Sequence, residues 1–519
     1  MKGFHVKNHS IAVRSVSVAA AAALSLGIAP LAPAYAQVGE VRQVDGVRVS
    51  DSTIDTSATG TLTIYKKANV DPTFKPTGEK DDRVSTADVL KGAGFTLYKV
   101  TNADLSTNKG IAAAAGLTLA TAVEGDAVGG EKTTDVNGKA NWDNLPVGVY
   151  ILRETTTPAG YSPAADSLVY VPMTRENATN GGTQWLYDIT AYPKNNSKEG
   201  PKKRVEDSGQ NVGDTVKYTI DTKPQKIQDG QFRNFYRVVD DLDPVLNTTA
   251  DQVKVYKNGT EITEGFTKIV DGQKVTVQLD KETAQGLTET DTISVEIAAT
   301  VSEKPENGDL QNKAVHYQNN PNKDEYWEPE DTPPGDTPNE ETPTIHTYYG
   351  GIEFKKVDGN REALADAEFQ VYGTNEDTCK NADAKAEALQ EVSGNDTWKS
   401  DGEGKVIIDG LHANNIANMD SDGKTTPNEY SKYCLFETKS PKGFELLAEP
   451  IEFTLTASTE DDTVSASEIK VGENAGEIVN LEDSTPKLPL TGGKGIGLLA
   501  LLGGLIIAAG AFAAKRRNA

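Results

Sequence analysis

The stretch TDVNGKANWDNLPVGVYILRETTTPAGY, residues 134–161, decides the fold, because it recurs later in the chain. The second copy is SDGEGKVIIDGL (residues 400–411), continued after an insertion by YSKYCLFETKSPKGF (residues 430–444). Each copy has a turn, a strand, a leucine and a second strand that runs into Glu-Thr-x-x-Pro-x-Gly-aromatic. Upstream, LTIYKK…GAGFTLYKV and IEFKKVDG…LADAEFQVYG alternate as half-buried strands do. The repeat predicts two related β domains.

The turn that opens each copy is rich in Asp, Asn and Gly, so it could be either a hairpin turn or a calcium loop. We favour the hairpin turn, because no later acidic residue completes the ligand spacing of a calcium loop.

Composition agrees with a β protein. Hydrophobic residues make up 37% of the chain, Met is rare, and Thr, Val, Gly and Asp are frequent, which favours β-sandwiches over helices. About 450 residues lie between the two end signals, enough for roughly three domains. The net charge of −25 argues against nucleic acid or anionic lipid as a partner.

Both ends of the chain carry export signals. Residues 1–36 read as a signal peptide, in which basic residues precede the apolar stretch 16–28 and APAYAQ offers a cleavage site after Ala36. Residues 495–514 are 20 uncharged residues, long enough to cross a bilayer core of about 30 Å. The basic tail 515–519 then favours a cytoplasmic end.

The segment LPLTG before this apolar span matches the LPxTG sorting signal of Gram-positive cell-surface proteins. In that family a membrane transpeptidase, sortase, cleaves between the Thr and the Gly and keeps the Thr as a thioester. The resemblance implies that the membrane helix only holds the substrate and is absent from the mature protein. The motif residues are Leu488, Pro489, Leu490, Thr491 and Gly492.

The two repeat copies resemble B-type immunoglobulin-like domains of the collagen-adhesin (Cna) kind. The segment between them, from KKRVEDSGQNVGDTVKYTID through VVDDLDP to LQNKAVHY, resembles an A-type Cna domain. The resemblance implies an all-β chain of tandem immunoglobulin-like sandwiches, with domains at 37–198, 199–344 and 345–485. The Pro- and acid-rich residues 321–343 read as an extended connector.

Domains of these families often close themselves with a Lys–Asn isopeptide bond. A desolvated, neutral Lys attacks the Asn, and a buried carboxyl polarises the Asn carbonyl and shuttles protons as ammonia leaves. The resemblance places the Lys, the promoting acid and the Asn at three sets of positions: Lys66, Glu154 and Asn195; Lys203, Asp240 and Asn312; Lys356, Glu437 and Asn480.

Alternatives stay open for these sets. Each could consist of ordinary surface residues on strands, and Lys202 is an alternative to Lys203. Whether the N-terminal domain carries a bond is also open, because some relatives lack one there and Lys66 is followed by Lys67.

Cys379 and Cys434 are the only two cysteines, and a structural disulfide is the expectation for an exported chain. Two free thiols, or a catalytic one, are the alternative. A disulfide would tie the insertion that carries Cys379 to the strand that carries Glu437.

Residues 185–194, WLYDITAYPK, resemble the pilin motif WxxxVxVYPK of sortase-assembled pilus backbones, with Ile and Ala in place of two valines. The resemblance implies that Lys194 is the amine that attacks the sortase-bound Thr491 of another copy. We expect Trp185 and Tyr192 to face inward and Lys194 to face outward. The alternative is a strand end with one solvated lysine.

The leading hypothesis is a structural protein, the major shaft subunit of a cell wall-anchored fimbria that supports adhesion. Its implied partners are other copies of itself, a pilus-specific and a housekeeping sortase, minor tip and base pilins, peptidoglycan, and a receptor on a host or bacterial surface. A wall-anchored adhesin displayed singly is the alternative. An enzyme is disfavoured, because none of His316, His346 and His412 has a metal-ligand spacing and no nucleophile motif occurs. We expect no cofactor and no metal.

Overall fold

The computed structural model describes residues 41–483, except residues 51–52, 71–73, 85–86, 178–181, 336, 382–387, 468–469 and 472–473. The expected signal peptide, sorting motif, membrane helix and basic tail lie outside the described residues. Within the described part, no helix is long and apolar enough to cross a membrane.

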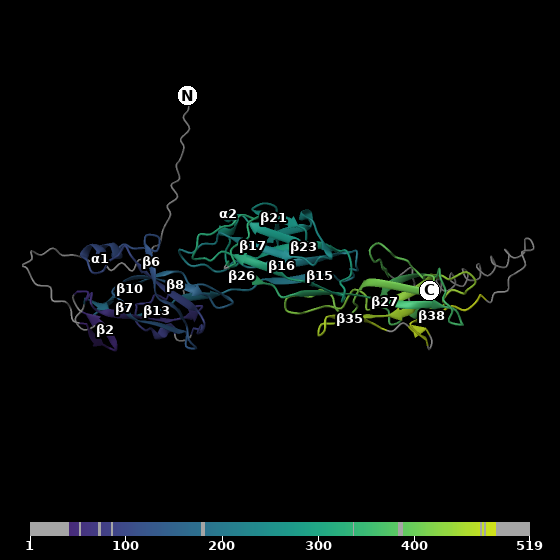
Figure 1. The fold of residues 1–519 in the computed structure, drawn as a ribbon, viewed down its shortest axis with the longest axis horizontal. Helices are drawn as coiled ribbons and strands as arrows, with labels where there is room; N and C mark the ends of the chain where they lie inside the picture. The colour runs from purple at the N-terminus through teal and green to yellow at the C-terminus, as the bar shows by residue number, and fades with distance from the viewer. Residues whose placement is uncertain are drawn as a thin grey trace, which may run out of the picture.

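Three β units follow one another along the long axis of the molecule (Figure 1). The N-terminal unit is drawn in purple to blue, the middle unit in teal, and the C-terminal unit in green to yellow. The described residues form only two short α-helices, α1 (Asn108–Ala115) and α2 (Lys281–Gln285). The expectation of an all-β chain of tandem sandwiches is therefore confirmed.

The N-terminal unit contains four small sheets, with strand orders β1-β2-β12-β11, β10-β8-β5-β6, β13-β3-β7 and β4-β14-β9. Its strands are β1 (Arg42–Val44), β2 (Val47–Ser50), β3 (Thr59–Tyr65), β4 (Lys67–Ala68), β5 (Gly94–Val100), β6 (Glu124–Thr133), β7 (Lys139–Pro146), β8 (Gly148–Thr156), β9 (Tyr161–Ser162), β10 (Ser167–Val171), β11 (Met173–Glu176), β12 (Thr183–Leu186), β13 (Asp188–Ala191) and β14 (Lys194–Ser197).

The middle unit has two larger sheets, β15-β16-β23-β19-β20, to which β18 adds, and β21-β22-β17-β25-β26. The strands are β15 (Lys202–Glu206), β16 (Thr215–Thr222), β17 (Tyr236–Asp241), β18 (Leu246–Asn247), β19 (Val253–Lys257), β20 (Thr260–Ile262), β21 (Phe266–Asp271), β22 (Lys274–Leu279), β23 (Ile293–Val301), β24 (Asp309–Asn312), β25 (Ala314–Gln318) and β26 (Asn339–Glu341).

The C-terminal unit pairs β27 with β24, β31 and β38, and β28 with β29, β30 and β32, and β33 follows β32. The hairpins β34-β35 and β36-β37 complete it. The strands are β27 (Ile345–Val357), β28 (Glu368–Thr374), β29 (Ala388–Leu389), β30 (Trp398–Lys399), β31 (Lys405–His412), β32 (Lys432–Lys439), β33 (Ile451–Phe453), β34 (Leu455–Ser458), β35 (Thr463–Ala466), β36 (Lys470–Val471), β37 (Asn474–Ala475) and β38 (Glu477–Val479).

Period-two burial explains why these segments are strands. In β3 (TGTLTIY) and β23 (ISVEIAATV) every second residue is buried, so one face of each strand packs on a core and the other lies nearer solvent. Thr and Ile recur in β3, and Ile, Val and Thr in β23, and β-branched side chains favour this extended, half-buried environment.

The sequence repeat is also a structural repeat, because β7 and β8 correspond to β31 and β32. The turn before β7 is closed by Asp135, whose Oδ1 accepts the N–H groups of Asn137 and Lys139 at 2.8 and 2.9 Å. Gly138 supplies the positive φ of 68° that this turn requires. Asp401 caps the second copy in the same way. These are tight turns, but the expected hairpins do not form, because β6 pairs with β5 and β7 with β3, and likewise β30 pairs with β28 and β31 with β27.

In both outer units a strand from the start of the unit lies parallel to one from its end. β3 pairs in parallel with β13, and β4 with β14, in the N-terminal unit. β27 pairs in parallel with β38 in the C-terminal unit. The chain therefore enters and leaves each unit along neighbouring strands.

The middle and C-terminal units share one continuous hydrophobic core, whereas the N-terminal unit has its own. Strand β27 explains the shared core. Residues 345–348 pair with β24, and residues 349–355 pair with β31 of the C-terminal unit. One strand thus crosses between the two units without a linker.

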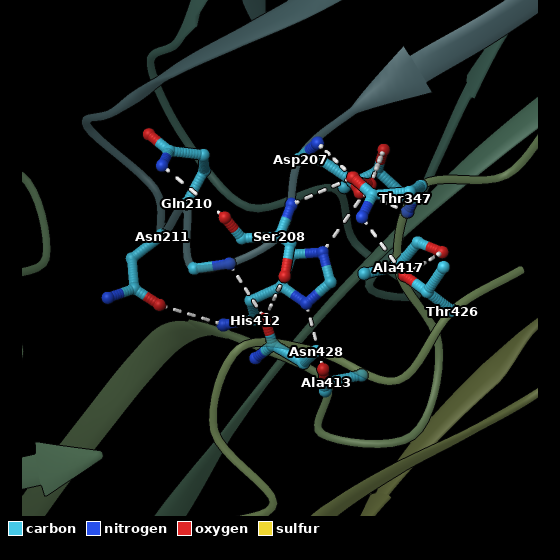
Figure 2. Close-up of polar contacts among 12 residues, drawn as sticks. Asp207, Ser208, Gln210, Asn211, Thr347, His412, Ala413, Ala417, Thr426 and Asn428 are labelled. Atoms are coloured by element: carbon cyan, nitrogen blue, oxygen red, sulfur yellow. Dashed lines mark hydrogen bonds and ion pairs between the residues drawn. The ribbon is translucent and has the colours of Figure 1, made fainter. Parts of the chain in front are cut away.

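A buried polar network joins the same two units (Figure 2). The carboxylate of Asp207, which follows β15, accepts hydrogen bonds from the Thr347 hydroxyl and the Asn418 N–H, both at 2.6 Å. The side chain of Asn211 accepts the N–H of His412 at 2.9 Å. Because Asp207 and His412 are fully buried, these directional bonds specify how the units meet.

The expected connector, residues 321–343, is not an extended linker. Arg237 donates to the carbonyls of Asp331 and Glu328 at 2.8 and 2.7 Å, and Trp327 packs edge-on against Phe235 at 4.8 Å. The aromatic residues within this acidic segment pack against the middle unit, which composition alone does not reveal.

The disulfide between Cys379 and Cys434 is confirmed, with a Cα–Cα distance of 5.6 Å. Cys434 lies on β32, three residues before Glu437, and Cys379 lies in the segment after β28. The bond ties that segment to the central strand of its sheet.

Reduction of this disulfide should destabilise the C-terminal unit by about 4 kcal/mol, since the bond closes a long loop in the unfolded chain. Thermal unfolding with and without reductant measures the effect. Native chain without reductant should not react with a thiol reagent, and labelling of either cysteine there would contradict the assignment.

Candidate functional site

The structure brings together the first set of expected residues inside the N-terminal unit. The Lys66 ammonium donates to Glu154 Oε2 at 2.9 Å and to the Asn195 side-chain oxygen. Asn195 Nδ2 donates to Glu154 Oε1 at 2.9 Å. The N–H of Ala164 holds the same carboxylate at 2.8 Å. All three side chains are buried, with Lys66 and Asn195 at 0% exposure.

The C-terminal unit repeats this arrangement. The Lys356 ammonium donates to the Asn480 side-chain oxygen and lies 3.3 Å from Glu437 Oε1. Asn480 Nδ2 donates to the same Oε1 at 2.8 Å, and the N–H of Leu447 donates to Oε2 at 2.8 Å. The two carboxylates are thus positioned by equivalent bonds from outside their strands.

The middle unit builds its set from strands of three sheets, β15, β17 and β24. Lys203 on β15 donates to Asp240 Oδ2 on β17 at 2.6 Å, and Asn312 Nδ2 lies 3.5 Å from the same oxygen. Lys203, Asp240 and Asn312 are almost fully buried, whereas Lys202 is exposed. Asp240 Oδ1 and Asn312 Oδ1 are buried without a hydrogen-bond partner. Burial therefore favours Lys203 over Lys202.

Burial changes the proton affinity of these groups. Desolvation lowers the pKa of Lys66 to about 8 and that of Lys356 to about 8, and the facing carboxylates offset part of the shift. Desolvation also lowers the pKa of Lys203 and raises the pKa of Asp240. Both directions favour a neutral amine beside a protonated acid, because an apolar surrounding disfavours charge.

An aromatic ring lies beside each amine. The nitrogens of Lys66, Lys203 and Lys356 lie 5.2, 5.0 and 5.9 Å from the ring centres of Phe95, Tyr218 and Phe369 respectively. These rings exclude water and still offer the ammonium a favourable face.

One feature differs from the expected polarisation of the Asn carbonyl. In both outer units the carboxylate contacts the amide nitrogen of the Asn, and the Asn oxygen faces the Lys. The carboxylate thus lies between the amine and the nitrogen that would leave.

The motif at 185–194 is placed partly as expected. Tyr192 is buried, packs against Phe74 and Tyr65, and its hydroxyl accepts the N–H of Asp81 at 2.7 Å. Trp185 is only half-buried, so its expected inward orientation is wrong. Gln184 and Leu186, on either side of Trp185 in β12, point inward instead, because successive side chains of a strand face opposite sides.

Lys194 opens β14 and is half-buried rather than fully outward. Its ammonium donates to the Phe74 carbonyl at 2.8 Å, and its own carbonyl accepts from Gln228 of the middle unit at 3.0 Å. The next residue is Asn195, so the candidate acceptor lysine adjoins the buried set. Thr491 lies outside the described residues.

Tertiary structure adds contacts that spacing did not predict. His412 joins Asp207 in the network of Figure 2. His346 meets Asp309 and Asp462, whose positions 37 and 116 residues away along the chain give no motif. His316 is buried, and desolvation lowers its pKa to about 3.

Comparison with known proteins agrees with this architecture. Residues 57–196 match the family described as Gram-positive pilin subunit D1, N-terminal domain, and residues 350–470 match a prealbumin-like fold domain. The chain is 30% identical to fimbrial subunit type 1 of Actinomyces viscosus, over 90% of this chain and 92% of that protein. It is 29% identical to fimbrial subunit type 2 of Actinomyces naeslundii, over 96% of each.

Among solved structures, the full-length major pilin SpaD from Corynebacterium diphtheriae aligns with a TM-score of 0.60 and 27% identity. The alignment covers 83% of this chain and 99% of that one.

Amine acetylation of the native chain should distinguish neighbouring lysines. Lys202 and Lys355 are exposed and should react, whereas Lys203 and Lys356 are buried and should not. Peptide mass spectrometry after labelling measures each pair. Equal labelling of Lys202 and Lys203 would contradict the burial described here.

Proposed function

This chain belongs to the major backbone pilins of Gram-positive pili and is a structural, non-enzymatic subunit of a surface fimbria, and we propose that it is polymerised covalently by sortase. In this proposal, Lys194 of one copy is joined to Thr491 of the next, and the finished fibre is anchored to peptidoglycan. The observation that carries the proposal is the position of Lys194, directly beside Asn195 of a buried Lys–Glu–Asn set.

We further propose that each buried set forms an isopeptide bond. The neutral Lys amine attacks Cγ of the Asn, so that a bond from Nζ to Cγ replaces the bond from Cγ to Nδ2. The acid takes a proton from the amine and returns one to Nδ2, which leaves as ammonia. The carboxylates of Glu154 and Glu437 contact both nitrogens, so they can serve both steps.

The lowered lysine pKa supports this chemistry. At pH 7 an amine of pKa about 8 is neutral in roughly one molecule in ten, against roughly one in three thousand for an ordinary lysine. The set is also held together by the fold, which removes the entropic cost of bringing the reacting groups together.

Strand order supports a mechanical role for these bonds. In the outer units the Lys and the Asn belong to neighbouring parallel segments at the start and end of the unit. In the C-terminal unit a pull along the fibre would shear these segments apart, and only hydrogen bonds and packing would resist it. A covalent bond between them carries the load past the rest of the unit.

The proposed linkage at Lys194 joins neighbouring subunits directly beside one of these bonds. Force that enters at Lys194 reaches Asn195 after one peptide bond, and a bond from Asn195 to Lys66 would tie the start of the N-terminal unit to this loaded point. The carbonyl of Lys194 is also held by Gln228, so the attachment point lies where the first two units meet.

Replacement of Glu437 by Gln should leave Lys356 and Asn480 unbonded, because Gln cannot shuttle protons. Relative to wild type, the intact mass should rise by one ammonia beyond the substitution itself, and the C-terminal unit should melt at a lower temperature. Glu403→Gln, in an exposed turn, is the control and should keep the wild-type loss. If both variants lack the same number of ammonia molecules, the role of Glu437 is wrong.

Replacement of Lys194 by Arg should abolish the ladder of detergent-resistant polymers, because the guanidinium keeps the charge but is not a nucleophile for the thioester. Lys67→Arg and Lys198→Arg are matched controls on neighbouring positions and should retain the ladder. Junction peptides from wild-type fibres should join Lys194 to Thr491.

Two outcomes would contradict polymerisation through Lys194. A ladder in Lys194→Arg with junctions at another lysine would refute this acceptor. An anchored wild-type chain without any ladder would support a singly displayed adhesin instead.

A further inference from the structure

Three side chains that are distant in sequence meet beside the boundary between the middle and C-terminal units. Asp309 lies on β24, His346 lies two residues from Asp309's partner Tyr348 on the paired strand β27, and Asp462 lies in the turn between β34 and β35. One ligand atom from each falls within 4.8 Å of the other two. The cluster is separate from the three lysine sets and from the Asp207 network.

The distances within the cluster fit a single small cation. His346 Nδ1 lies 2.9 Å from Asp309 Oδ1 and 3.7 Å from Asp462 Oδ1. Nitrogen and oxygen ligands about 2.0–2.1 Å from a tetrahedral zinc ion are about 3.3–3.4 Å apart. One observed separation is shorter and the other longer than that value, and all three atoms lie within 4.8 Å of one another, so side-chain rotation is needed to bring them onto one ion.

Each ligand is oriented by a further contact. Gln311 donates to Asp309 Oδ2 at 2.6 Å, and the Tyr348 hydroxyl donates to Asp462 Oδ1 at 3.2 Å. The His346 ring stacks on the Tyr348 ring, with centres 5.9 Å apart. Such outer contacts are typical of metal sites, where they hold carboxylates and imidazoles in a fixed direction.

Charge balance in the cluster is poor without a cation. The Asp309 side chain is fully buried, and a buried carboxylate requires compensation. Nδ1 of His346 carries at most one proton, and the hydrogen bond that this proton can donate goes to Asp309 at 2.9 Å. The second carboxylate, Asp462, also faces this pair, accepts a hydrogen bond from the Tyr348 hydroxyl and is partly open to solvent. A divalent ion with a neutral imidazole balances both carboxylates.

We propose that Asp309, His346 and Asp462 bind a zinc ion that ties the β34–β35 turn to the boundary between the two units. One imidazole and two carboxylates suit zinc, with water in the fourth position. Calcium prefers six to eight oxygen ligands at longer distances. Asp462 is 41% exposed, so the ion can enter from solvent. The site would stiffen this boundary independently of polymerisation.

Zinc titration of the chelator-treated full-length chain by isothermal calorimetry tests the proposal. Wild type should show one saturable site. Asp462→Asn should weaken binding by more than about 100-fold, because it removes a ligand charge. Asn also tolerates the positive φ of 51° at this position, so folding should be unaffected. His346→Gln should abolish the site.

Asp461→Asn is the matched control, because Asp461 occupies the adjacent position but lies outside the cluster. This variant should bind zinc as wild type does. Zinc should also raise the melting temperature of wild type and of Asp461→Asn, but not of Asp462→Asn, because only a native site is stabilised by its ligand.

Four results would overturn the proposal. They are the absence of a saturable zinc site in wild type, unchanged binding in both His346→Gln and Asp462→Asn, an equal loss in Asp461→Asn, and calcium binding at the same site with equal affinity.

Discussion

The structure depends on burying a lysine ammonium beside a carboxylate and an asparagine in each of three units. An unpaired charge at 0% exposure would destabilise any fold, so each set must be complete to be tolerated. Lys66 and Lys356 show how completeness is reached, since an N–H from a neighbouring loop holds each facing carboxylate in place. The same burial that demands a partner also lowers the lysine pKa, which favours the neutral amine that the proposed isopeptide bond requires.

The three units are not joined alike. The middle and C-terminal units share a core, a through-going strand β27 and the buried contacts around Asp207, so they behave as one body. The N-terminal unit has a separate core and meets the middle unit through polar contacts, among them Gln228 with the Lys194 carbonyl and Lys198 with Glu340. Polar contacts of this kind permit more relative motion than a shared apolar core. The more adaptable joint therefore lies beside the proposed attachment point.

Much of the fold and of the three lysine sets was predictable from the sequence. The repeat around residues 134–161 and 400–444 indicated two related β domains, because strand alternation and turn chemistry are local properties. The positions of Lys66, Glu154 and Asn195 followed from a family resemblance and met in space, as did those of the other two sets. The disulfide followed from having only two cysteines in an exported chain.

Other features were decided by tertiary structure alone. Sequence placed Lys203 in the set and kept Lys202 as an alternative, and the side of β15 that faces the core favours Lys203. The acidic segment 321–343 looked like a linker, yet its aromatic residues pack on the middle unit. His346, Asp309 and Asp462 carry no common motif, because β24, β27 and the β34–β35 turn meet only after the two units share a core. Local periodicity determines strands and turns, whereas side chains brought together over long sequence separations are determined by packing.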